Sequence, residues 1–432
     1  MDASIGIWGG VECTVNRIGD SYRSQMVASG HDRRITDLDV FAGLKVSKLR
    51  YPVLWENVAP RAPSELNWGW SDQRLSRLQT LGVEPIVGLL HHGSGPIYTH
   101  LLDDAFPKLF GAYAGEVARR YPWVQQFTPI NEPLTTARFS GLYGHWYPHA
   151  RSDAAFARAL VNQSRATVFA MRAIRSVNPR AQLVATDDLG QTFSTESIRY
   201  QADFDNERRW LGWDLISGKV DRTHPLFRYL LDSCVSRAEL DWLCANPCPP
   251  DVIGINHYIT SDRMLHEQWE HFPECTWGGN GRHQYADTEA VRVLDDYVPG
   301  FTRSMMQAWE RYRTPVALTE VHLGCDIDDQ VRWLDQAWRA AHESRALGVP
   351  VLAVTSWALL GSYDWNSLLT REEGHYEAGA FDVSSGVPRP TKIARTLRQL
   401  AEHGAHVLSG RVLERGWWEH ESRITVRLTA NA

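Results

Sequence analysis

Short apolar runs alternate with amphipathic stretches along almost the whole chain. Eight runs have the length of strands, and most precede a segment whose apolar residues recur with a helical period. Near-continuous apolar strands are typical of parallel sheets buried on both faces. The pattern predicts an α/β fold, a single-domain (β/α)8 TIM barrel over residues 1–405, with 406–432 as a C-terminal tail or linker remnant. The predicted strands are 5–12, 47–55, 84–92, 125–133, 182–188, 252–258, 316–320 and 351–357, and the predicted helices lie near 32–43, 71–81, 103–120, 153–177, 328–347 and 391–403.

Polar side chains gather where the predicted strands end. The carboxyl ends of the strands form the functional face of such a barrel. Because these groups are rare elsewhere along the strands, the pattern indicates an enzyme. The ends carry Glu12, Trp55, His91, His92, Asn131, Glu132, Asp187, Asp188, Asn256, His257, Tyr258, Glu320 and Trp357.

Two glutamates, Glu132 and Glu320, each follow an apolar strand. A carboxylate there is costly to bury unless it is paired or used, and a structural salt bridge is the ordinary alternative for either one alone. Two carboxylates facing one cleft suit glycoside hydrolysis. Arg50 and Tyr258 could hold Glu320 ionised, which would leave Glu132 protonated as a general acid, and Asn131 could bind a sugar hydroxyl.

Metal-dependent chemistry is the competing interpretation of these strand ends. Histidines and aspartates could bind zinc, as in barrel amidohydrolases, but such sites usually begin with a His-x-His pair on the first strand, which this chain lacks. We therefore predict neither a metal nor a cofactor. A phosphate-binding barrel is also disfavoured, because no Gly-rich loop opens a helix after strand seven or eight. The residues considered for zinc are His91, His92, Asp187, Asp188 and His257.

Composition narrows the possible partners. The chain has 432 residues and a net charge of −6, which argues against nucleic acid, and no apolar run suggests a membrane partner. The amino terminus does not resemble a signal peptide, and six scattered cysteines suit free thiols, so we expect a cytoplasmic location. Eighteen tryptophans are unusually many, and some of these rings could stack on sugars, although core packing explains many of them. The expected partner is a small glycoside or oligosaccharide, and the oligomeric state is left open.

Five segments together resemble glycoside hydrolase family 1. Thr128–Pro133 looks like its Asn-Glu-Pro acid/base motif, and Leu318–His322 looks like its Thr-Glu-Asn-Gly nucleophile motif, with a departure after the glutamate. Leu49–Trp55 and Asp251–Tyr258 are similar to two of its strands, and Trp357–Trp365 is similar to its sugar-binding segment. The resemblance extends from Trp8 to about Leu400, and the order and spacing of the motifs make it specific.

The resemblance implies a retaining β-glycosidase of the β-glucosidase type, with Glu132 as acid/base and Glu320 as nucleophile. It implies that Arg50 and Tyr258 orient Glu320. The family's first-strand glutamine aligns with Asn16, with Glu12 as its rival, and the glutamate that grips the 4- and 6-hydroxyls is here the shorter Asp364. Discrimination among gluco, galacto and fuco sugars is therefore expected to be modest. Further implied sugar contacts are Asn131 at the 2-hydroxyl, His91 at the 3-hydroxyl, Trp357 beneath the ring, and Trp365.

Two alternatives stay open at this point. The same covalent intermediate could be taken by a sugar or an alcohol, which would make the protein a transglycosylase. A non-catalytic sugar-binding barrel that supports a sugar-nucleotide enzyme is the other, although retention of both glutamates argues against it. The chain also resembles bacterial proteins in which such a barrel precedes a dTDP-4-dehydrorhamnose reductase-like domain, but it contains no Gly-x-Gly-x-x-Gly stretch. The long insertions 192–250 and 260–299 are expected to shape the substrate cleft.

Overall fold

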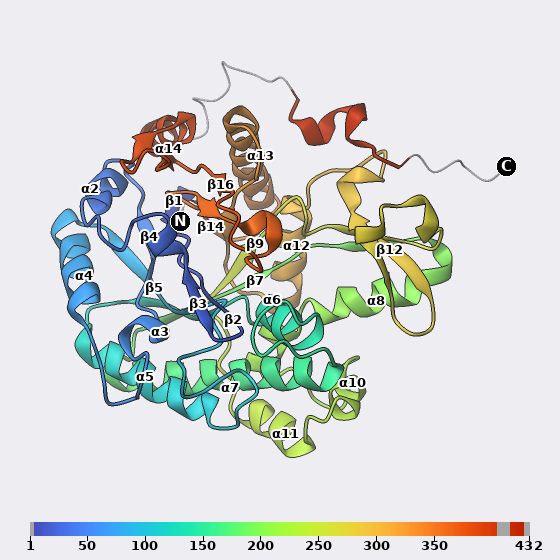
Figure 1. Cartoon of the computed structure of the whole chain (residues 1–432), viewed down its shortest axis with the longest axis horizontal. Helices are drawn as coiled ribbons and strands as arrows, with labels where there is room; N and C mark the ends of the chain where they lie inside the picture. The colour runs from blue at the N-terminus through green and yellow to red at the C-terminus, as the bar shows by residue number, and fades with distance from the viewer. Residues whose placement is uncertain (1–3, 404–414, 427–432) are drawn as a thin grey trace.

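The computed structural model describes residues 4–403 and 415–426. Eight parallel strands close into a barrel in the order β1-β14-β13-β9-β7-β6-β5-β4 and lie at the centre of the molecule, with helices around them (Figure 1). The predicted (β/α)8 barrel is thus confirmed, and each barrel strand lies within or next to its predicted run. The strands are β1 (Gly6–Gly10), β4 (Lys48–Pro52), β5 (Glu84–His91), β6 (Gln126–Asn131), β7 (Gln182–Asp188), β9 (Val252–Asn256), β13 (Val316–Val321) and β14 (Val351–Ser356).

The long helices cover the outer face of the barrel, as their amphipathic pattern requires. Ser152 caps the longest one, α7, by accepting from the backbone N–H of Ala155, and Asp326 caps α13 in the same way through Asp328 and Asp329. The helices of the outer ring are α2 (Asp37–Ala42), α4 (Gly69–Leu81), α5 (Phe106–Arg120), α7 (Asp153–Val177), α12 (Phe301–Tyr312), α13 (Ile327–Ala346) and α14 (Lys392–His403).

The two insertions carry their own secondary structure. The first contains short helices, and both contribute strands to a four-stranded sheet in the order β11-β12-β10-β8, beside α8 in Figure 1. The elements outside the main βα alternation are α1 (Gln25–Ala28), α3 (Trp55–Val58), α6 (Pro133–Ala137), α8 (Arg199–Arg208), α9 (Leu211–Ile216), α10 (Phe227–Asp232), α11 (Arg237–Ala245), β2 (Val15–Ile18), β3 (Ser21–Ser24), β8 (Thr192–Ser194), β10 (Arg263–His266), β11 (Trp277–Gly279), β12 (Gln284–Glu289), β15 (Ser362–Tyr363), β16 (Tyr376–Glu377), β17 (Phe381–Asp382) and β18 (Arg389–Pro390).

The core has an inner and an outer part. All residues of β6 and β13 are buried, which explains why these strands read as continuous apolar runs. Alternate side chains point to the barrel interior and to the surrounding helices. The small inner cluster closes the barrel below the strand ends, so that the polar end residues face the open mouth. It consists of Trp8, Ile86, Val184, Val252, Ala317 and Ala353.

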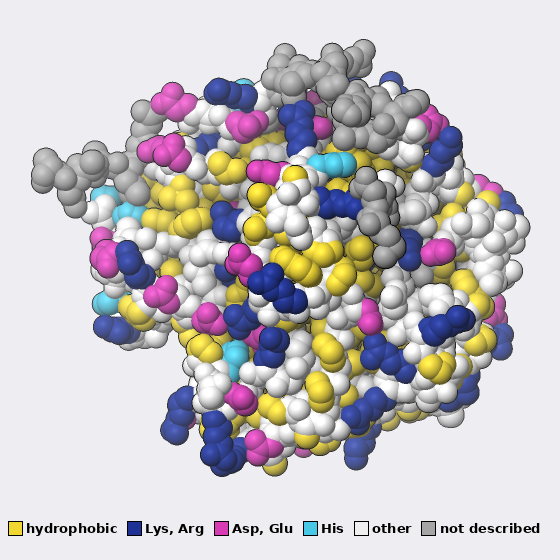
Figure 2. Space-filling model, turned by 180° about the vertical axis from the view of Figure 1, so that it is seen from behind, with side chains coloured by type: hydrophobic (Ala, Val, Ile, Leu, Met, Phe, Trp, Pro, Cys, Tyr) yellow, Lys and Arg dark blue, Asp and Glu magenta, His cyan; other side chains and the backbone are white. Residues whose placement is uncertain are grey.

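The C-terminal segment 415–426 lies against the barrel, near the β12 hairpin in Figure 1. The expected domain boundary between residues 405 and 406 falls outside the described residues, so the division of the chain stays a prediction. No helix among the described residues is long and apolar enough to cross a membrane. Figure 2 shows Lys, Arg, Asp and Glu side chains scattered over the rear face without gathering by sign.

Candidate active site

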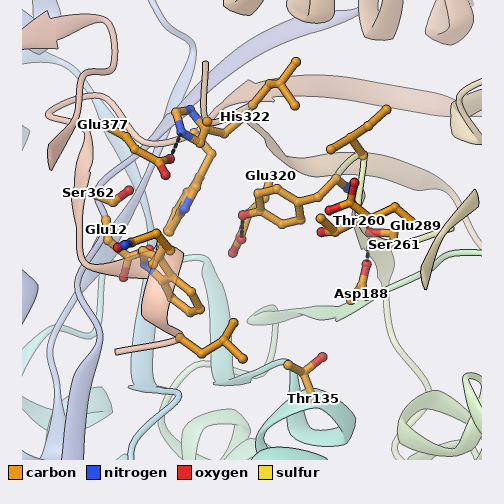
Figure 3. A pocket seen from close by; sticks show the side chains of 18 of the residues that line it. Glu12, Thr135, Asp188, Thr260, Ser261, Glu289, Glu320, His322, Ser362 and Glu377 are labelled. Carbon is orange, nitrogen blue, oxygen red and sulfur yellow. Dashed lines mark hydrogen bonds and ion pairs between the residues drawn. The ribbon is translucent and has the colours of Figure 1, made fainter. Parts of the chain in front are cut away.

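The mouth of the barrel holds a cavity of about 390 Å3. Glu132 and Glu320 both line it, so the fold brings together two strand ends that are far apart in sequence. Figure 3 shows Glu12 on one side of Glu320 and Asp188 on the other, which gives the cavity two distinct halves.

Glu320 lies near the end of β13 and is 2% exposed. The Nη1 atom of Arg50 donates to its Oε1 over 2.8 Å, and the hydroxyl of Tyr258 donates to its Oε2 over 2.5 Å. Arg50 belongs to β4 and Tyr258 follows β9, so closure of the barrel brings both donors to one carboxylate. Each oxygen of Glu320 therefore has a strong donor, which favours its ionised form.

Glu132 follows β6 and leaves the strand conformation. Its φ of +45° lies in the left-handed region, which is strained for a residue with a side chain. The Nδ2 atom of Asn256 donates to its Oε1 over 2.6 Å, and Thr319 fixes that amide by donating to Asn256 Oδ1. The Nε2 atom of His92 lies 3.9 Å from Oε2, but burial lowers the pKa of His92 to about 3, with a contribution from the charge of Arg50. No positively charged group therefore pairs with Glu132, whose hydrogen-bond partner is a neutral amide.

These surroundings separate the protonation states of the two glutamates. Burial raises the pKa of Glu132 well above its ordinary value, and the negative charge of Glu320 raises it further. Burial also raises the pKa of Glu320, but the charge of Arg50 and the hydrogen bond from Tyr258 oppose the rise. Burial and both carboxylates raise the pKa of Tyr258 well above its usual range, so the phenol keeps its proton and donates. The favoured state is a protonated Glu132 beside an ionised Glu320.

Asn131, the last residue of β6, lies beneath the cavity wall. Its Oδ1 accepts from Arg50 Nη2 over 2.6 Å and from the hydroxyl of Thr186 over 2.7 Å. Its Nδ2 lies 3.2 Å from Nε2 of His91 and 3.4 Å from Nε2 of His92. Arg50 thus links Glu320 to the residue that precedes Glu132.

The two histidines after β5 differ from the expected arrangement. Sequence interpretation chose His91 for the sugar contact, but the structure places His92 in the cavity wall. The choice of His91 came from the family resemblance, whereas the positive φ of His92, +54°, ends the strand alternation at His91. His91 stacks on Trp357 instead, with ring centroids 5.3 Å apart and planes 8° apart, and it lies deeper than the cavity.

Trp357 lines the cavity directly after β14. The guanidinium carbon of Arg50 lies 4.7 Å from its ring centroid, on which His91 also stacks. Gly10 of β1 is required here, because a Cβ at that position would come within 2.3 Å of the indole. The ring is therefore held in place by neighbouring strands.

Glu12 and Asn16 were rivals for one sugar contact, and the structure separates them. Glu12 lines the cavity, and its Oε1 accepts from the backbone N–H and the hydroxyl of Thr14 over 2.9 and 2.6 Å. Asn16 lies on β2, outside the wall, and its amide has no hydrogen-bond partner among the described residues. Burial raises the pKa of Glu12, against the hydrogen bonds from Thr14.

Asp364 lies outside the cavity wall, whereas Trp365 lines it. The Oδ1 atom of Asp364 accepts from the backbone N–H of Glu373 over 3.1 Å and from that of His375 over 2.8 Å. This short carboxylate is held by its own loop. The acid at this side of the wall is Glu377 on β16, which accepts from His322 Nε2 over 3.0 Å.

Glu377 and His322 are cavity residues that sequence reasoning did not select. Burial alone would raise the pKa of Glu377, but the hydrogen bond and charge of His322 and the charge of His375 lower it. His322 offered a weak signal, since it stands where the sequence departs from the nucleophile motif. Asn256 was noted at a strand end without a role, and Trp417 was noted only as part of the tail.

Of the residues considered for zinc, His92 and Asp188 line the cavity, whereas Asp187 and His257 bind the backbone. Asp187 Oδ2 accepts from the backbone N–H of Leu134 over 3.2 Å, and His257 Nδ1 contacts the carbonyl of Leu189 over 2.8 Å. Within residues 4–403 and 415–426, no group of three or more His, Cys, Asp or Glu side chains could hold a metal ion.

The family model for glycosyl hydrolase family 1 matches residues 4–376, and the chain belongs to this family. It is therefore a glycoside hydrolase by family, with the barrel and the two strand-end glutamates that the sequence predicted. No curated protein sequence matches the chain significantly.

Solved structures share this fold at low sequence identity. A family 1 β-glucosidase from Thermotoga maritima superposes with a TM-score of 0.75 and 15% identity, covering 92% of this chain and 98% of that one. A β-glucosidase from the same organism in complex with deoxynojirimycin gives 0.75 and 15%, covering 94% and 99%. Its complex with cyclophellitol gives 0.74 and 17%, covering 94% and 98%. At these sequence identities, the superpositions show that the folds are similar and nothing further.

Proposed function

We propose that the protein is a retaining β-glycosidase that hydrolyses β-linked hexosides by double displacement. One observation carries the proposal: Glu132 and Glu320 line the same buried cavity in opposite electrostatic surroundings. A glycosidase that uses two carboxyl groups needs one protonated and one ionised at the glycosidic bond, and membership of family 1 supports the retaining course.

In the first step, an oxygen of Glu320 attacks the anomeric carbon. The bond from that carbon to the aglycone oxygen breaks, and the proton of Glu132 moves to the departing oxygen. Arg50 and Tyr258 hold the attacking carboxylate in one orientation through its two oxygens. The product of this step is a glycosyl ester on Glu320 and a neutral alcohol.

In the second step, Glu132 is ionised and takes a proton from water. The water oxygen bonds to the anomeric carbon, the ester bond breaks, and Glu320 returns as a carboxylate. Two inversions give overall retention of the β configuration. A sugar or alcohol that took the place of water would give transglycosylation by the same residues.

The side of the cavity that holds Glu12 and Glu377 supplies most of the proposed contacts to the reacting sugar (Figure 3). Trp357 offers a flat apolar face, and His92 takes the 3-hydroxyl role first given to His91. Asn131 keeps its proposed contact to the 2-hydroxyl. Glu377 takes over the proposed contact to the distal hydroxyls from Asp364, whose carboxylate binds its own loop.

The similar structures support a sugar substrate. The Thermotoga maritima β-glucosidase has been solved with deoxynojirimycin and also with galacto-hydroximolactam. We propose that the present protein discriminates weakly among gluco, galacto and fuco substrates. The proposed cytoplasmic location rests on six cysteines, all of them free.

The proposal is tested with purified protein and a panel of aryl β-glycosides of glucose, galactose and fucose. Hydrolysis of at least one is expected, with rates for the three sugars of similar magnitude, and proton NMR should show the β anomer as the first product. An α anomer would contradict the retaining mechanism. Absence of turnover on every β-glycoside would contradict the function itself.

A further inference from the structure

The segment 415–426, which we call the C-terminal strap, packs on the barrel beyond the residues that the family model matches. Trp418 is buried against Trp333, with ring centroids 5.1 Å apart, and its Nε1 donates to Gln336 Oε1 over 2.7 Å. Both contacts are to α13, the helix that follows the nucleophile strand. The strap is therefore anchored to the barrel at one of its ends.

A second anchor ties the strap to the loop after β12. Arg423 is 6% exposed and donates to the carbonyl of Val291 over 3.1 Å and to that of Asp295 over 2.5 Å. The backbone N–H of Thr425 donates to the carbonyl of Arg292 over 3.1 Å. A buried arginine whose donors bind main-chain carbonyls fixes the two segments relative to each other.

Directly before the first anchor, Trp417 reaches the catalytic cavity and forms part of its wall. The guanidinium carbon of Arg292 lies 4.2 Å from its ring centroid, and Arg292 Nε donates to Glu289 Oε2 over 3.1 Å. Arg292 and Glu289 also line the cavity. In Figure 3, Glu289 lies with Thr260 and Ser261 on the side of Glu320 opposite Glu12.

We infer that Trp417, Arg292 and Glu289 form a subsite for the sugar residue on the leaving-group side of the cleaved bond. The inference rests on the proposed function, in which Glu377 contacts the reacting sugar on the other side of Glu320 (Figure 3). An indole plane stacks on the apolar face of a sugar ring, and adjacent carboxylate and guanidinium groups bind its hydroxyls. An aryl aglycone would use the plane but not these polar groups, so the preferred substrates are β-linked disaccharides.

The test compares wild-type protein with Trp417→Ala on methyl β-glucoside and on β-1,3-, β-1,4- and β-1,6-linked glucobioses. Alkyl and sugar alcohols are similarly poor leaving groups, so a difference between them reports contacts to the second sugar. We expect kcat/KM for the preferred glucobiose to fall about tenfold, mainly through KM, with less than a twofold change for methyl β-glucoside. Arg292→Gln should show the same pattern more weakly. Trp277→Ala removes an exposed indole outside the cavity wall and should change neither substrate.

Three results would overturn the subsite. They are an equal loss on both substrate types, no loss on any glucobiose, and a larger loss on phenyl β-glucoside than on the glucobioses. Arg423→Met should reproduce the Trp417→Ala pattern by releasing the second anchor, and an unchanged glucobiose KM in a folded Arg423→Met protein would also contradict the inference.

A binding measurement keeps this test separate from the proposed function. Titration calorimetry with thiocellobiose, which is not hydrolysed, should show about tenfold weaker binding to Trp417→Ala than to wild type, with glucose binding unchanged. If the wild type hydrolyses no β-glycoside but shows this difference, the proposed function fails and the subsite stands. If the wild type hydrolyses β-glycosides and the difference is absent, the subsite fails alone.

Discussion

The ends of β6 and β13 deliver the same side chain to one cavity and give it different surroundings. Glu320 lies within β13 and accepts hydrogen bonds from Arg50 and Tyr258. Glu132 directly follows β6, has a left-handed backbone conformation, and accepts a hydrogen bond from the uncharged amide of Asn256. The comparison shows that the barrel gives two chemically identical side chains different electrostatic surroundings through their partners.

A single guanidinium group accounts for much of the difference. Arg50 donates through Nη1 to Glu320 and through Nη2 to Asn131. Its second nitrogen therefore binds the residue before Glu132, and not Glu132 itself. Were the cation shared equally, both pKa values would fall together and neither glutamate would be a proton donor near neutral pH. The predictions below test this division of roles.

Replacement of Glu320 should have the largest effect. Glu320→Gly removes the attacking oxygen, so hydrolysis should fall on the order of 10⁴-fold or more. Azide should restore part of the activity and give the α-azide, because the anion enters from the vacated face. With wild-type protein, a 2-fluoro sugar carrying a reactive leaving group should give a covalent adduct on Glu320, located by mass spectrometry of peptides. An adduct on any other residue would contradict the assignment of Glu320 as the nucleophile.

Replacement of Glu132 should have an effect that depends on the leaving group. Glu132→Gln keeps the shape of the side chain but supplies no acid, so alkyl glycosides should lose about 10²–10⁴-fold in kcat/KM. Glycosides with good leaving groups, such as dinitrophenol, need little protonation and should lose far less. Glu132→Gly with azide should give the β-azide. Equal losses across a series of leaving groups would show that Glu132 is not the proton donor.

Removal of the Tyr258 hydroxyl should have a smaller effect, visible in the pH profile. Its hydrogen bond to Glu320 lowers the pKa of that carboxyl, so Tyr258→Phe should raise the pKa. The acid limb of kcat/KM, which reports ionisation of Glu320, should then move to higher pH. Turnover should fall roughly 10–100-fold, the effect of losing one hydrogen bond to a charged group. An acid limb that stayed in place or moved to lower pH would show that the Tyr258 hydroxyl does not lower the pKa of Glu320.

Sequence reasoning located the barrel and brought Glu132 and Glu320 to one face because both follow from regular patterns. The helix over 153–177 was predicted with the bounds it has, and the strands before Glu132 and Glu320 were found from continuous apolar runs. Parallel strands of one barrel must bring their carboxyl ends to one face. Position along a strand was therefore enough to place these two side chains at the cavity.

The remaining wall depended on turns and loops whose geometry leaves no periodic signal. His92 enters the wall because its φ is positive, and Asp364 is held by backbone N–H groups that only the folded loop presents. Glu377 and Trp417 reach the cavity through contacts with distant segments, to His322 and Arg292 respectively. A motif gives the type of such a residue, whereas its direction depends on the completed tertiary structure.

A third buried carboxylate tests the physical basis of the comparison with the smallest expected effect on turnover. Glu56 of α3 lies outside the cavity wall, and its Oε1 accepts from the backbone N–H of Gly95 over 3.2 Å. Its Oε2 has no hydrogen-bond partner among the described residues. Burial raises the pKa of Glu56 from 4.5 to about 7, despite hydrogen bonds from the backbone. Like Glu132, it is buried beside neutral donors.

Because its pKa is higher in the folded state, folded protein holds the Glu56 proton more tightly than unfolded protein does. The contribution of Glu56 to wild-type stability should therefore fall as pH rises from about 4.5 to about 7, and its loss should be complete above that range. Glu56→Gln cannot ionise, so its free energy of unfolding relative to wild type should rise by roughly 2–3 kcal/mol between pH 5 and pH 8. Urea unfolding at the two pH values measures this, with the exposed Glu196→Gln as control, and turnover at pH 6 should change less than about twofold. If the difference in unfolding free energy between Glu56→Gln and wild type is the same at both pH values, burial without a cation does not hold a proton on a carboxyl group in this protein, and the protonated state proposed for Glu132 loses its physical basis.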